Sequence, residues 1–421
     1  MKDPFSYKFF RKNRQKLKAH IDNDSLAFLY SNHRMPRNGD QYFPFRQNSD
    51  LFYLSGIEQE GTILLIDKEN EYLFIEEPDR LSSLWEGDKL QAEQAKSISG
   101  IENIQWTHQF GNITDKLLRT KKKLYFNTTE KLNQGGIKPQ DQIYLEHFRA
   151  RYPFHMFLSL KPVLSELRLR KEPEETDAIQ HAIDITGKAL KRVFEMIRPG
   201  ISEKAMEAEI KREFMLHHAN GSAFDPIIAS GRNATVLHYS KNSDVCREEE
   251  LVLLDLGAEF RNYAADITRT IPAKGRFTSR QKECYHAVLE IMETMQKEIK
   301  PGTTIKELND KIIEQLTGKH LELGLYKKKD IDGKESPVWK KYFPHGVSHF
   351  IGLDVHDPGD KNVILDKGMV ISWEPGIYIP EENTGIRIED DILVDNPPVN
   401  LSSKIPKEIE DLENLIRNQK E

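Results

Sequence analysis

The sequence predicts an α/β (α+β) protein with a smaller N-terminal mixed α/β domain and a larger C-terminal domain of two similar halves. Three observations lead to this prediction: the length of 421 residues, a change of pattern near residue 165, and an internal repeat. A chain of this length exceeds what one hydrophobic core normally supports, so two cores are expected.

The N-terminal domain, residues 1–165, combines one helical pattern with short apolar runs. A basic amphipathic helix is expected near residues 6–20. It is followed by the runs SLAFLYS, DLFYLSG, TILLID and EYLFIE. Runs of this length are typical of strands, so we expect the four to belong to one sheet.

The C-terminal domain, residues 166–421, opens with a long helical pattern. The stretch KEPEETDAIQHAIDITGKALKRVFEMI starts at Lys171 with glutamates, which favour a helix N-terminus, and Pro199-Gly200 marks its end. This change from short apolar runs to long helices predicts the domain boundary.

An internal repeat divides the C-terminal domain. IRPGISEKAMEAEI from Ile197 and IKPGTTIKELNDKI from Ile299 share Ile, Pro-Gly, Lys and the final Ile at one offset. Each copy ends one helix and starts another, and Thr304 and Glu307 have capping-box spacing. Pro-Gly between helices is common, so chance is the alternative. A real repeat predicts two α/β halves that face each other across a cleft, where sites are usually found.

Composition argues against several classes of protein. The net charge of -6 and the pI near 6.2 offer no broad attraction for nucleic acid. No apolar run reaches the length of a membrane span, and the first residues do not resemble a secretory signal, so we expect a cytoplasmic protein without a membrane partner. Cys246 and Cys284 are the only cysteines, which excludes a disulfide framework and a thiolate metal cage.

Two aspartates lie in apolar strand-like segments of ELVLLDLGAEFRNYAADITRT. A turn near Arg261-Asn262 would form a hairpin that brings Asp255 and Asp266 together. A buried charge is costly unless something pairs with it, and a cation would relieve both carboxylates. The alternative is a structural aspartate paired with Arg261 or Arg269.

Three histidines occur in FPHGVSHFIGLDVHD, at positions 345, 349 and 356. Neutral imidazoles can ligate metal or transfer protons near pH 7, although a lone histidine would more often be a core residue. Gly346 and Gly352 imply tight backbone paths, which favour a site loop over a long helix.

Two further strand-like runs, VISWEPGIYI and TGIRIEDDILV, each have a glutamate at the centre, Glu374 and Glu389. Pro375-Gly376 should interrupt the first strand directly after its glutamate. Arg387 lies two residues before Glu389 on the same strand face, which makes it an electrostatic partner for the site carboxylates.

Together these segments supply four carboxylates and one imidazole, from Asp255, Asp266, His349, Glu374 and Glu389. Oxygen ligands with little nitrogen and no sulfur suit Mn²⁺, Co²⁺ or similar ions. Two divalent ions would balance a charge of about -4, as in two-metal hydrolases.

At these positions the sequence resembles the metallopeptidase family with the pita-bread fold, and specifically its aminopeptidase P (Xaa-Pro aminopeptidase) branch. DLG, ADITRT, HGVSH, GLDVHD, EPGIY and GIRIEDD occur in the family order, with HYSKN upstream. YFPFRQNSDLFYLSG extends the resemblance into the N-terminal domain. The resemblance implies an aminopeptidase P-like N-terminal domain and a catalytic pita-bread domain of two pseudo-symmetric halves.

The resemblance also implies a metal-dependent exopeptidase that hydrolyses the N-terminal Xaa-Pro bond of peptides. Asp255 would bind one ion, His349 and Glu374 the other, and Asp266 and Glu389 both. The ions would be Mn²⁺, with Co²⁺ or Zn²⁺ as alternatives, and a hydroxide between them would attack. Glu374 would relay the proton to the leaving proline nitrogen.

Further residues receive roles from the same resemblance. His238 and His356 would face the substrate and donate hydrogen bonds to it, and Arg387 and His345 would support the site. Tyr378 would lie near the substrate. Trp85, in an LWEG loop, would reach the site of a neighbouring subunit in a homo-oligomer, a dimer or a tetramer.

Trp373 departs from the family pattern, in which a smaller residue is expected before the metal glutamate. Neighbours on a strand point to opposite faces, so Trp373 should pack between sheet and helices. Three other functions stay open: an Xaa-Pro dipeptidase (prolidase), a non-catalytic interaction module with this fold, and a creatinase-like hydrolase.

Overall fold

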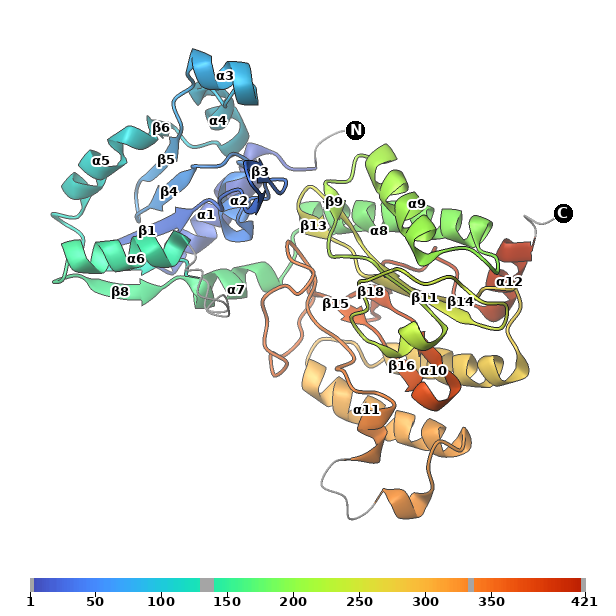
Figure 1. Cartoon of the computed structure of the whole chain (residues 1–421). Helices are drawn as coiled ribbons and strands as arrows, with labels where there is room; N and C mark the ends of the chain where they lie inside the picture. Colours follow the sequence, from blue (N-terminus) through green and yellow to red (C-terminus); the bar gives the residue numbers. More distant parts are fainter. Residues whose placement is uncertain (1–3, 129–139, 332–336, 418–421) are drawn as a thin grey trace. The chain divides into compact units, whose positions relative to one another are not determined.

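The computed structural model describes residues 4–128, 140–331 and 337–417. The chain forms two compact units, Met1–Leu167 and Arg168–Glu421 (Figure 1). Each has its own buried apolar core, as expected for a chain of this length.

A six-stranded mixed sheet forms the centre of the N-terminal unit, in the order β6-β5-β4-β1-β7-β8. Its strands are β1 (Ser25–Tyr30), β4 (Ile63–Ile66), β5 (Glu71–Ile75), β6 (Asn103–Trp106), β7 (Lys123–Phe126) and β8 (Met156–Ser159). β4 is antiparallel to β1 and β5, whereas β6, β7 and β8 run parallel to their neighbours. A small hairpin, β2 (Pro36–Asn38) and β3 (Gln41–Tyr42), lies outside this sheet.

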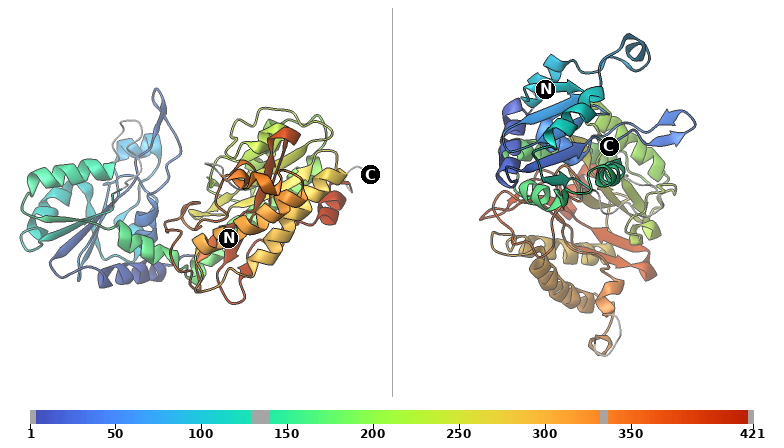
Figure 2. Two further views of the ribbon diagram at one scale, coloured as in Figure 1. Left: turned by 90° about the horizontal axis from the view of Figure 1, so that it is seen from below. Right: turned by 90° about the vertical axis from the view of Figure 1, so that its left-hand side faces the viewer.

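Helices cover both faces of this sheet (Figures 1 and 2). The helices of this unit are α1 (Tyr7–Ala19), α2 (Ser49–Ser55), α3 (Arg80–Glu86), α4 (Ala92–Ser99), α5 (Phe110–Leu117), α6 (Gln140–Arg151) and α7 (Lys161–Leu169), of which α3 buries no residue and α7 ends just past the unit boundary at Leu167. Side chains alternate along β1: Leu26 and Phe28 join the core beside α5 and α6, while Ala27 and Leu29 are buried on the other face.

Most of the predicted N-terminal elements are confirmed, but one is wrong. The helix near residues 6–20 is α1, and three apolar runs are β1, β4 and β5. DLFYLSG forms helix α2 instead of a strand. The Asn48 side chain accepts from the Asp50 and Leu51 amides, and Gly56 ends the helix at φ 69°. Because every residue of α2 is buried, including the polar Asp50 and Ser55, the run lacks the exposed polar face that would reveal a helical period.

The first half of the C-terminal unit pairs two helices with an antiparallel sheet. The helices are α8 (Pro173–Met196) and α9 (Glu203–Leu216), and the sheet order is β10 (Ile227–Ser230), β11 (Leu251–Leu256), β14 (Ile267–Pro272). A smaller sheet contains β9 (Gly221–Ser222), β12 (Ala258–Phe260) and β13 (Tyr263–Ala264). The long helix expected from Lys171 is confirmed as α8.

The second half repeats this plan with α10 (Ser279–Gln296) and α11 (Ile305–Glu322). Its strands are β15 (Val370–Trp373), β16 (Gly376–Ile379), β17 (Thr384–Arg387), β18 (Asp390–Leu393) and β19 (Val399–Asn400), followed by α12 (Ile409–Arg417). α8 and α9 lie on one side of the central strands, and α10 and α11 lie on the opposite side (Figure 1).

Matching hydrogen bonds at the two copies confirm the internal repeat. Ser202 and Thr304, at equivalent positions, are the N-caps of α9 and α11, and each side chain accepts from an amide three residues on, at 3.1 Å. Equivalent backbone bonds run from Gly200 N to Cys246 O and from Gly302 N to Leu365 O. The predicted capping box of α11 is also present, because Glu307 Oε2 accepts from Thr304 N.

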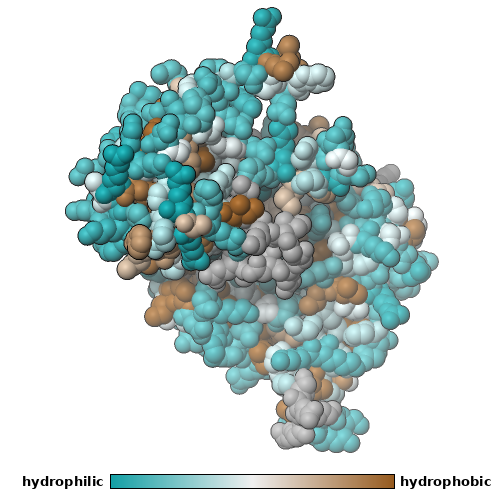
Figure 3. All heavy atoms as spheres, turned by 60° about the vertical axis from the view of Figure 1, so that its left-hand side comes forward, coloured by the Kyte–Doolittle hydropathy of each residue, from teal (hydrophilic) through white to brown (hydrophobic). Residues whose placement is uncertain are grey.

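The surface agrees with the polar composition. The face drawn in Figure 3 is mostly hydrophilic, with separate small hydrophobic areas. Among the helices that the structure describes, none combines the length and the apolar character that crossing a membrane requires.

Candidate metal centre

A hairpin brings Asp255 and Asp266 to one place. β11 and β14 are antiparallel with Asp255 opposite Thr268, and Asp266 lies two residues before Thr268, hence on the same face. The expected turn is confirmed: Arg261 and Asn262 have φ 50° and 65° between β12 and β13. At Gly257 a Cβ atom would lie 1.7 Å from the Ala265 oxygen, so the close approach of these strands requires glycine.

A second pair of strands brings the two glutamates together. β15 pairs with β18, with Trp373 opposite Asp390, and β16 pairs with β17, with Gly376 opposite Arg387. Continued across the break, this register sets Glu374 opposite Glu389. Two like charges in this position repel, which a bound cation would relieve.

Both predicted strands are interrupted at their glutamates. The break after Glu374, at Pro375-Gly376, was expected and is confirmed. The placement of Glu389 at the centre of a strand is wrong, because it lies between β17 and β18 and does not share a continuous strand with Arg387. Its amide donates to Thr268 O of β14 at 3.1 Å. At Glu389 the backbone therefore pairs with β14 and no longer with β16, the partner of β17.

His349 lies in an irregular segment before β15, as the glycines predicted. Its backbone amide donates to Ser372 Oγ at 3.0 Å, and its ring Nδ1 donates to the Phe350 carbonyl at 3.1 Å. Donation from Nδ1 leaves the Nε2 lone pair free for a ligand. Nε2 lies 3.4 Å from Asp266 Oδ2 and 3.7 Å from Glu374 Oε1.

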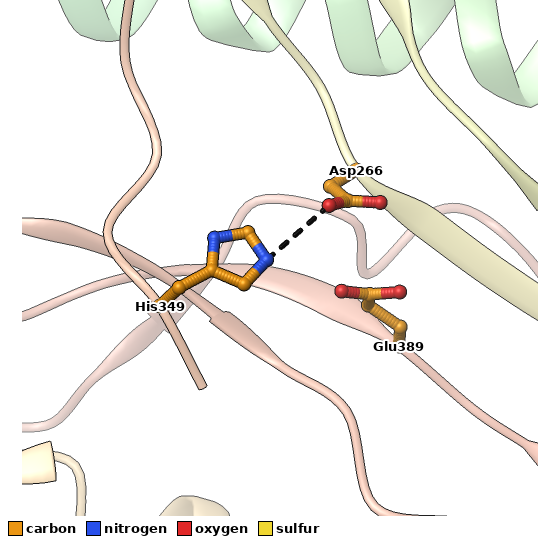
Figure 4. A group of neighbouring side chains, drawn as sticks. All are labelled: Asp266, His349 and Glu389. Atoms are coloured by element: carbon orange, nitrogen blue, oxygen red, sulfur yellow. Dashed lines mark ion pairs between the residues drawn. The ribbon is translucent and has the colours of Figure 1, made fainter. Parts of the chain in front are cut away.

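Three of the predicted ligands form a compact cluster. Asp266, His349 and Glu389 each offer one atom, and these atoms lie within 4.8 Å of one another (Figure 4). Burial, reinforced by the neighbouring carboxylates, holds the pKa values of Asp266 and Glu389 well above their usual range. Burial also raises the pKa of Glu374, although His349 and Arg387 oppose the shift.

The donor set fits divalent ions. Asp255 Oδ1 is buried and has no hydrogen-bond partner in the described part of the chain. Among the residues that the structure describes, Arg387 is the one lysine or arginine within 4.0 Å of these four carboxylates. Pairing of Asp255 with Arg261 or Arg269 is ruled out, since Asp255 contacts Arg387 at 2.5 Å and Arg269 contacts Asp390 at 2.7 Å.

Arg387 joins the carboxylates to Tyr378 and His345. Its guanidinium donates to Asp255 Oδ2 at 2.5 Å, to Tyr378 Oη at 2.8 Å and to Thr268 Oγ1 at 3.1 Å. Tyr378 Oη is also 2.8 Å from His345 Nε2. Burial lowers the pKa of His345 to about 3 and raises that of Tyr378 to about 12, so both are neutral near pH 7. The Nδ1 of His345 donates to the Gly346 carbonyl at 2.8 Å, so the Nε2 of the neutral ring accepts from the tyrosine hydroxyl.

The other two predicted histidines are exposed. The ring of His356 lies 4.5 Å from the ring of His349. His238 follows the short helix Gly231–Thr235 and is one of the groups whose charge lowers the pKa of His345, which places it near that residue.

Trp85 belongs to the N-terminal unit and is 84% exposed. The expectation of a loop is wrong, because Trp85 lies in helix α3, which begins at an Asp79 side-chain cap.

Three supporting residues were missed at the level of sequence. Thr268 Oγ1 donates to Glu389 Oε2 at 2.6 Å, Ser372 Oγ accepts from the His349 amide, and Asp391 Oδ2 accepts from the Asp266 amide at 3.1 Å. Each lies two residues from a predicted ligand, at positions 266, 374 and 389. On a strand, residues two apart lie on the same face. This spacing from a predicted ligand is the sequence feature that could have identified the three supporting residues.

This fold and site define a metal-dependent hydrolase of two similar α/β halves with a carboxylate-rich metal centre. The sequence model of metallopeptidase family M24 matches residues 177–396, and that of the aminopeptidase P N-terminal domain matches residues 10–125. The chain belongs to metallopeptidase family M24. The resemblance drawn from the motifs is thereby confirmed.

Curated relatives align over nearly the whole chain. The Xaa-Pro aminopeptidase of Haemophilus influenzae is 34% identical, over 97% of this chain and 96% of its own. The Xaa-Pro aminopeptidase of Escherichia coli is 33% identical, over 97% of both chains. Escherichia coli aminopeptidase P, solved with the inhibitor Pro-Leu, superposes with a TM-score of 0.90 at 31% identity, covering 99% of both chains. The expected fold, an N-terminal mixed α/β domain and a pita-bread domain, is confirmed.

Proposed function

We propose that this protein is a metal-dependent Xaa-Pro aminopeptidase, which removes the N-terminal residue from peptides whose second residue is proline. The observation that carries the proposal is the cluster of Asp266, His349 and Glu389, with Asp255 and Glu374 beside it. Such a concentration of buried carboxylates is costly without cations. The full-length relatives named as Xaa-Pro aminopeptidases support the same activity.

Two divalent ions would be held by these five side chains. Asp255 would bind one ion, and His349 and Glu374 the other, while Asp266 and Glu389 would bind both. When bound, the ions supply Lewis acidity that lowers the pKa of water and polarises the scissile carbonyl. Mn²⁺ suits an oxygen-rich donor set, and Co²⁺ or Zn²⁺ are the alternatives.

The protein's own residues would handle protons and orient the substrate. Glu374, whose burial raises its pKa, would take a proton from the attacking water and deliver it to the proline nitrogen. His238 and His356, both exposed, would donate hydrogen bonds to the substrate carbonyl and the tetrahedral intermediate. Arg387 and His345 would support the site through Tyr378, which would lie near the substrate.

The chemistry of proline explains the need for a dedicated enzyme. An Xaa-Pro bond has no N–H on its proline side, and the ring fixes φ. A peptidase that grips an extended backbone through that N–H loses a contact and meets a ring. Histidines and metal ions that act on the carbonyl side do not depend on it.

Assembly, domain roles and location complete the proposal. Residues 1–165 would form the aminopeptidase P-like domain and residues 166–421 the catalytic domain. Helix α3 exposes Leu81, Leu84 and Trp85, an apolar surface that would be covered in a homo-oligomer, a dimer or a tetramer. Trp85 would then contact the substrate of a neighbouring subunit. The protein would act in the cytoplasm, without nucleic-acid or membrane partners.

The test compares hydrolysis of an Xaa-Pro dipeptide and an Xaa-Pro-Yaa tripeptide by the purified protein, with added Mn²⁺ or with a chelator. We expect turnover of the tripeptide that the chelator abolishes and Mn²⁺ restores. Activity confined to the dipeptide would identify a prolidase instead. Hydrolysis of a guanidino compound alone would indicate the creatinase-like alternative, and no hydrolysis together with no bound metal would indicate an interaction module.

A further inference from the structure

A buried carboxylate anchors the segment that carries His238. Glu203 is the first residue of α9, and it is 0% exposed. The segment starts at Ser230, at the end of β10, and runs to Asp244. Both of its ends contact Glu203, so the side chain closes the segment into a loop.

Five hydrogen bonds reach the Glu203 carboxylate. Oε1 accepts from Ser230 N and Oγ, both at 2.8 Å, and from Asn233 Nδ2 at 3.0 Å. Oε2 accepts from Tyr239 Oη and from Asp244 N, both at 2.8 Å. The Glu203 amide in turn donates to Asp244 O at 2.9 Å. Tyr239, one of the donors, is the residue directly after His238.

All five donors are uncharged. Within the described residues, no lysine, arginine or histidine lies within 4.0 Å of the Glu203 carboxylate. A carboxylate is costly to bury unless hydrogen bonds replace those it makes to water. Among the described residues, these five hydrogen bonds are what offsets that cost for Glu203. Only an acceptor-only group with two oxygens can accept from all of them, and a glutamine would turn one oxygen into a donor.

A second contact holds the same segment one turn further along α9. Asn242 is buried and has φ 46°, in the left-handed region. Its Oδ1 accepts from Ile228 N at 3.0 Å, and its Nδ2 donates to Pro226 O at 2.8 Å and to Glu207 Oε2 at 3.1 Å. Glu207 follows Glu203 by four residues, so both carboxylates lie on one face of the helix.

These contacts explain the HYSKN motif. Tyr239 and Asn242 are tied to the fold, whereas His238 is exposed and lies between the anchored residues Asn233 and Tyr239. The segment also continues directly from β10, which pairs with β11 with Ile227 opposite Asp255. The anchored segment therefore begins at the end of β10, and β10 is hydrogen-bonded to β11, the strand that carries the predicted ligand Asp255.

We propose that Glu203 is a positioning residue that holds His238 toward the substrate by fixing the segment from Ser230 to Asp244. The inference rests on the substrate-facing role proposed for His238. Glu203 itself is fully buried and would act only through this segment, so its loss should matter only while His238 is present.

A double-mutant cycle tests this coupling. We expect Glu203→Gln to lower kcat/KM for an Xaa-Pro-Yaa tripeptide by about tenfold, the loss typical of a hydrogen bond to a charged group. His238→Ala should also lower kcat/KM. The double variant should have the same kcat/KM as His238→Ala alone. Once the imidazole is absent, displacing the segment cannot lower kcat/KM any further. A merely structural role would cost the same factor in both backgrounds.

Controls separate the segment from general stability. Glu209→Gln, on the same helix but paired with Arg192 and Arg212, should leave kcat/KM unchanged. Tyr239→Phe removes one donor and keeps Glu203, so it repeats the cycle if Glu203→Gln fails to fold. Hydrogen exchange of residues 230–244, measured without substrate, should be faster in both segment variants than in Glu209→Gln.

The outcomes distinguish the inference from the proposed function. Additive losses in the cycle, or unchanged kcat/KM and unchanged exchange in both variants, would overturn the positioning role while tripeptide turnover by the unmodified protein stands. Absence of that turnover would overturn the proposed function, and with it the role given to Glu203.

Discussion

Arg387 Nη2 lies 2.5 Å from Asp255 Oδ2, and both side chains are buried. The same guanidinium donates to Tyr378 and Thr268, so its planar fork serves three partners at once. A lysine offers one point charge on a flexible chain and cannot reproduce this geometry. The pair therefore depends on arginine and not only on positive charge.

We predict that Arg387→Lys lowers kcat/KM by about a hundredfold, the effect expected when two charge-assisted hydrogen bonds are lost. Steady-state kinetics on an Xaa-Pro-Yaa tripeptide measures the loss. Arg276→Lys, at an exposed position, is the matched control and should behave like the unmodified protein. Near-native kinetics of Arg387→Lys would show that charge alone is sufficient.

Asp266→Ala or Glu389→Ala should abolish hydrolysis and reduce the bound metal. Each removes a side chain proposed to bind both ions, and Asp266 is also within 3.4 Å of the His349 ring nitrogen. Turnover and metal content per chain are measured on the same samples. Asp366→Asn, an exposed carboxylate paired with Arg170, serves as the control. Full metal content with near-native turnover in either alanine variant would refute the shared-ligand assignment.

Glu175 should make stability depend on pH. Burial raises its pKa to about 7, although Tyr263 Oη donates to it at 2.8 Å. In the unfolded chain the pKa is near the usual value, about 4.3. The folded protein thus holds a proton that the unfolded chain has lost, so its stability falls as pH rises from that value through about 7.

We therefore predict that Glu175→Gln, which cannot titrate, flattens the change in Tm between roughly pH 5 and pH 8. Thermal unfolding at several pH values, with the control Glu174→Gln, measures this slope. The slope is compared and not the absolute Tm, because glutamine also loses an acceptor. An unchanged slope would show that Glu175 is ionised throughout this range.

Trp373 should contribute to stability rather than to chemistry. As its alternation with Glu374 predicted, it is fully buried, and its Nε1 donates to Met292 O of α10 at 3.0 Å. Trp373→Phe removes volume and this hydrogen bond, and should destabilise the fold by about 2–4 kcal/mol. Denaturant unfolding measures the loss, with Trp339→Phe as control. A large fall in kcat at low temperature with unchanged stability would contradict this role.

The strands and helices of both units were largely predictable because their local patterns agree with their environments. α1 and α8 have one apolar face, and the runs that form β1, β4 and β5 are short and apolar. DLFYLSG is the exception. Its helix α2 is buried on all sides, so packing and the caps at Asn48 and Gly56 decide its conformation, and periodicity cannot.

The side chains of the candidate site could be picked out from the sequence, but the contacts between them could not. Asp255, Asp266, His349 and the two glutamates stand out as charges in apolar or glycine-rich segments. That Asp255 pairs with Arg387 instead of Arg261 or Arg269 depends on which strands meet, across more than a hundred residues of chain. Likewise, no sequence pattern predicts that Glu203 accepts hydrogen bonds from the segment that carries His238.

By itself, the sequence determined the family and the two-halved catalytic domain, and it predicted the types of ligand, because motif order, the Pro-Gly repeat and the cost of buried charge are all properties of local sequence. Only the tertiary structure decided that Glu374 stands opposite Glu389, which side chain neutralises Asp255, and what holds His238 in place. Those facts depend on strand register and on contacts between distant segments, and folding is what brings such segments together.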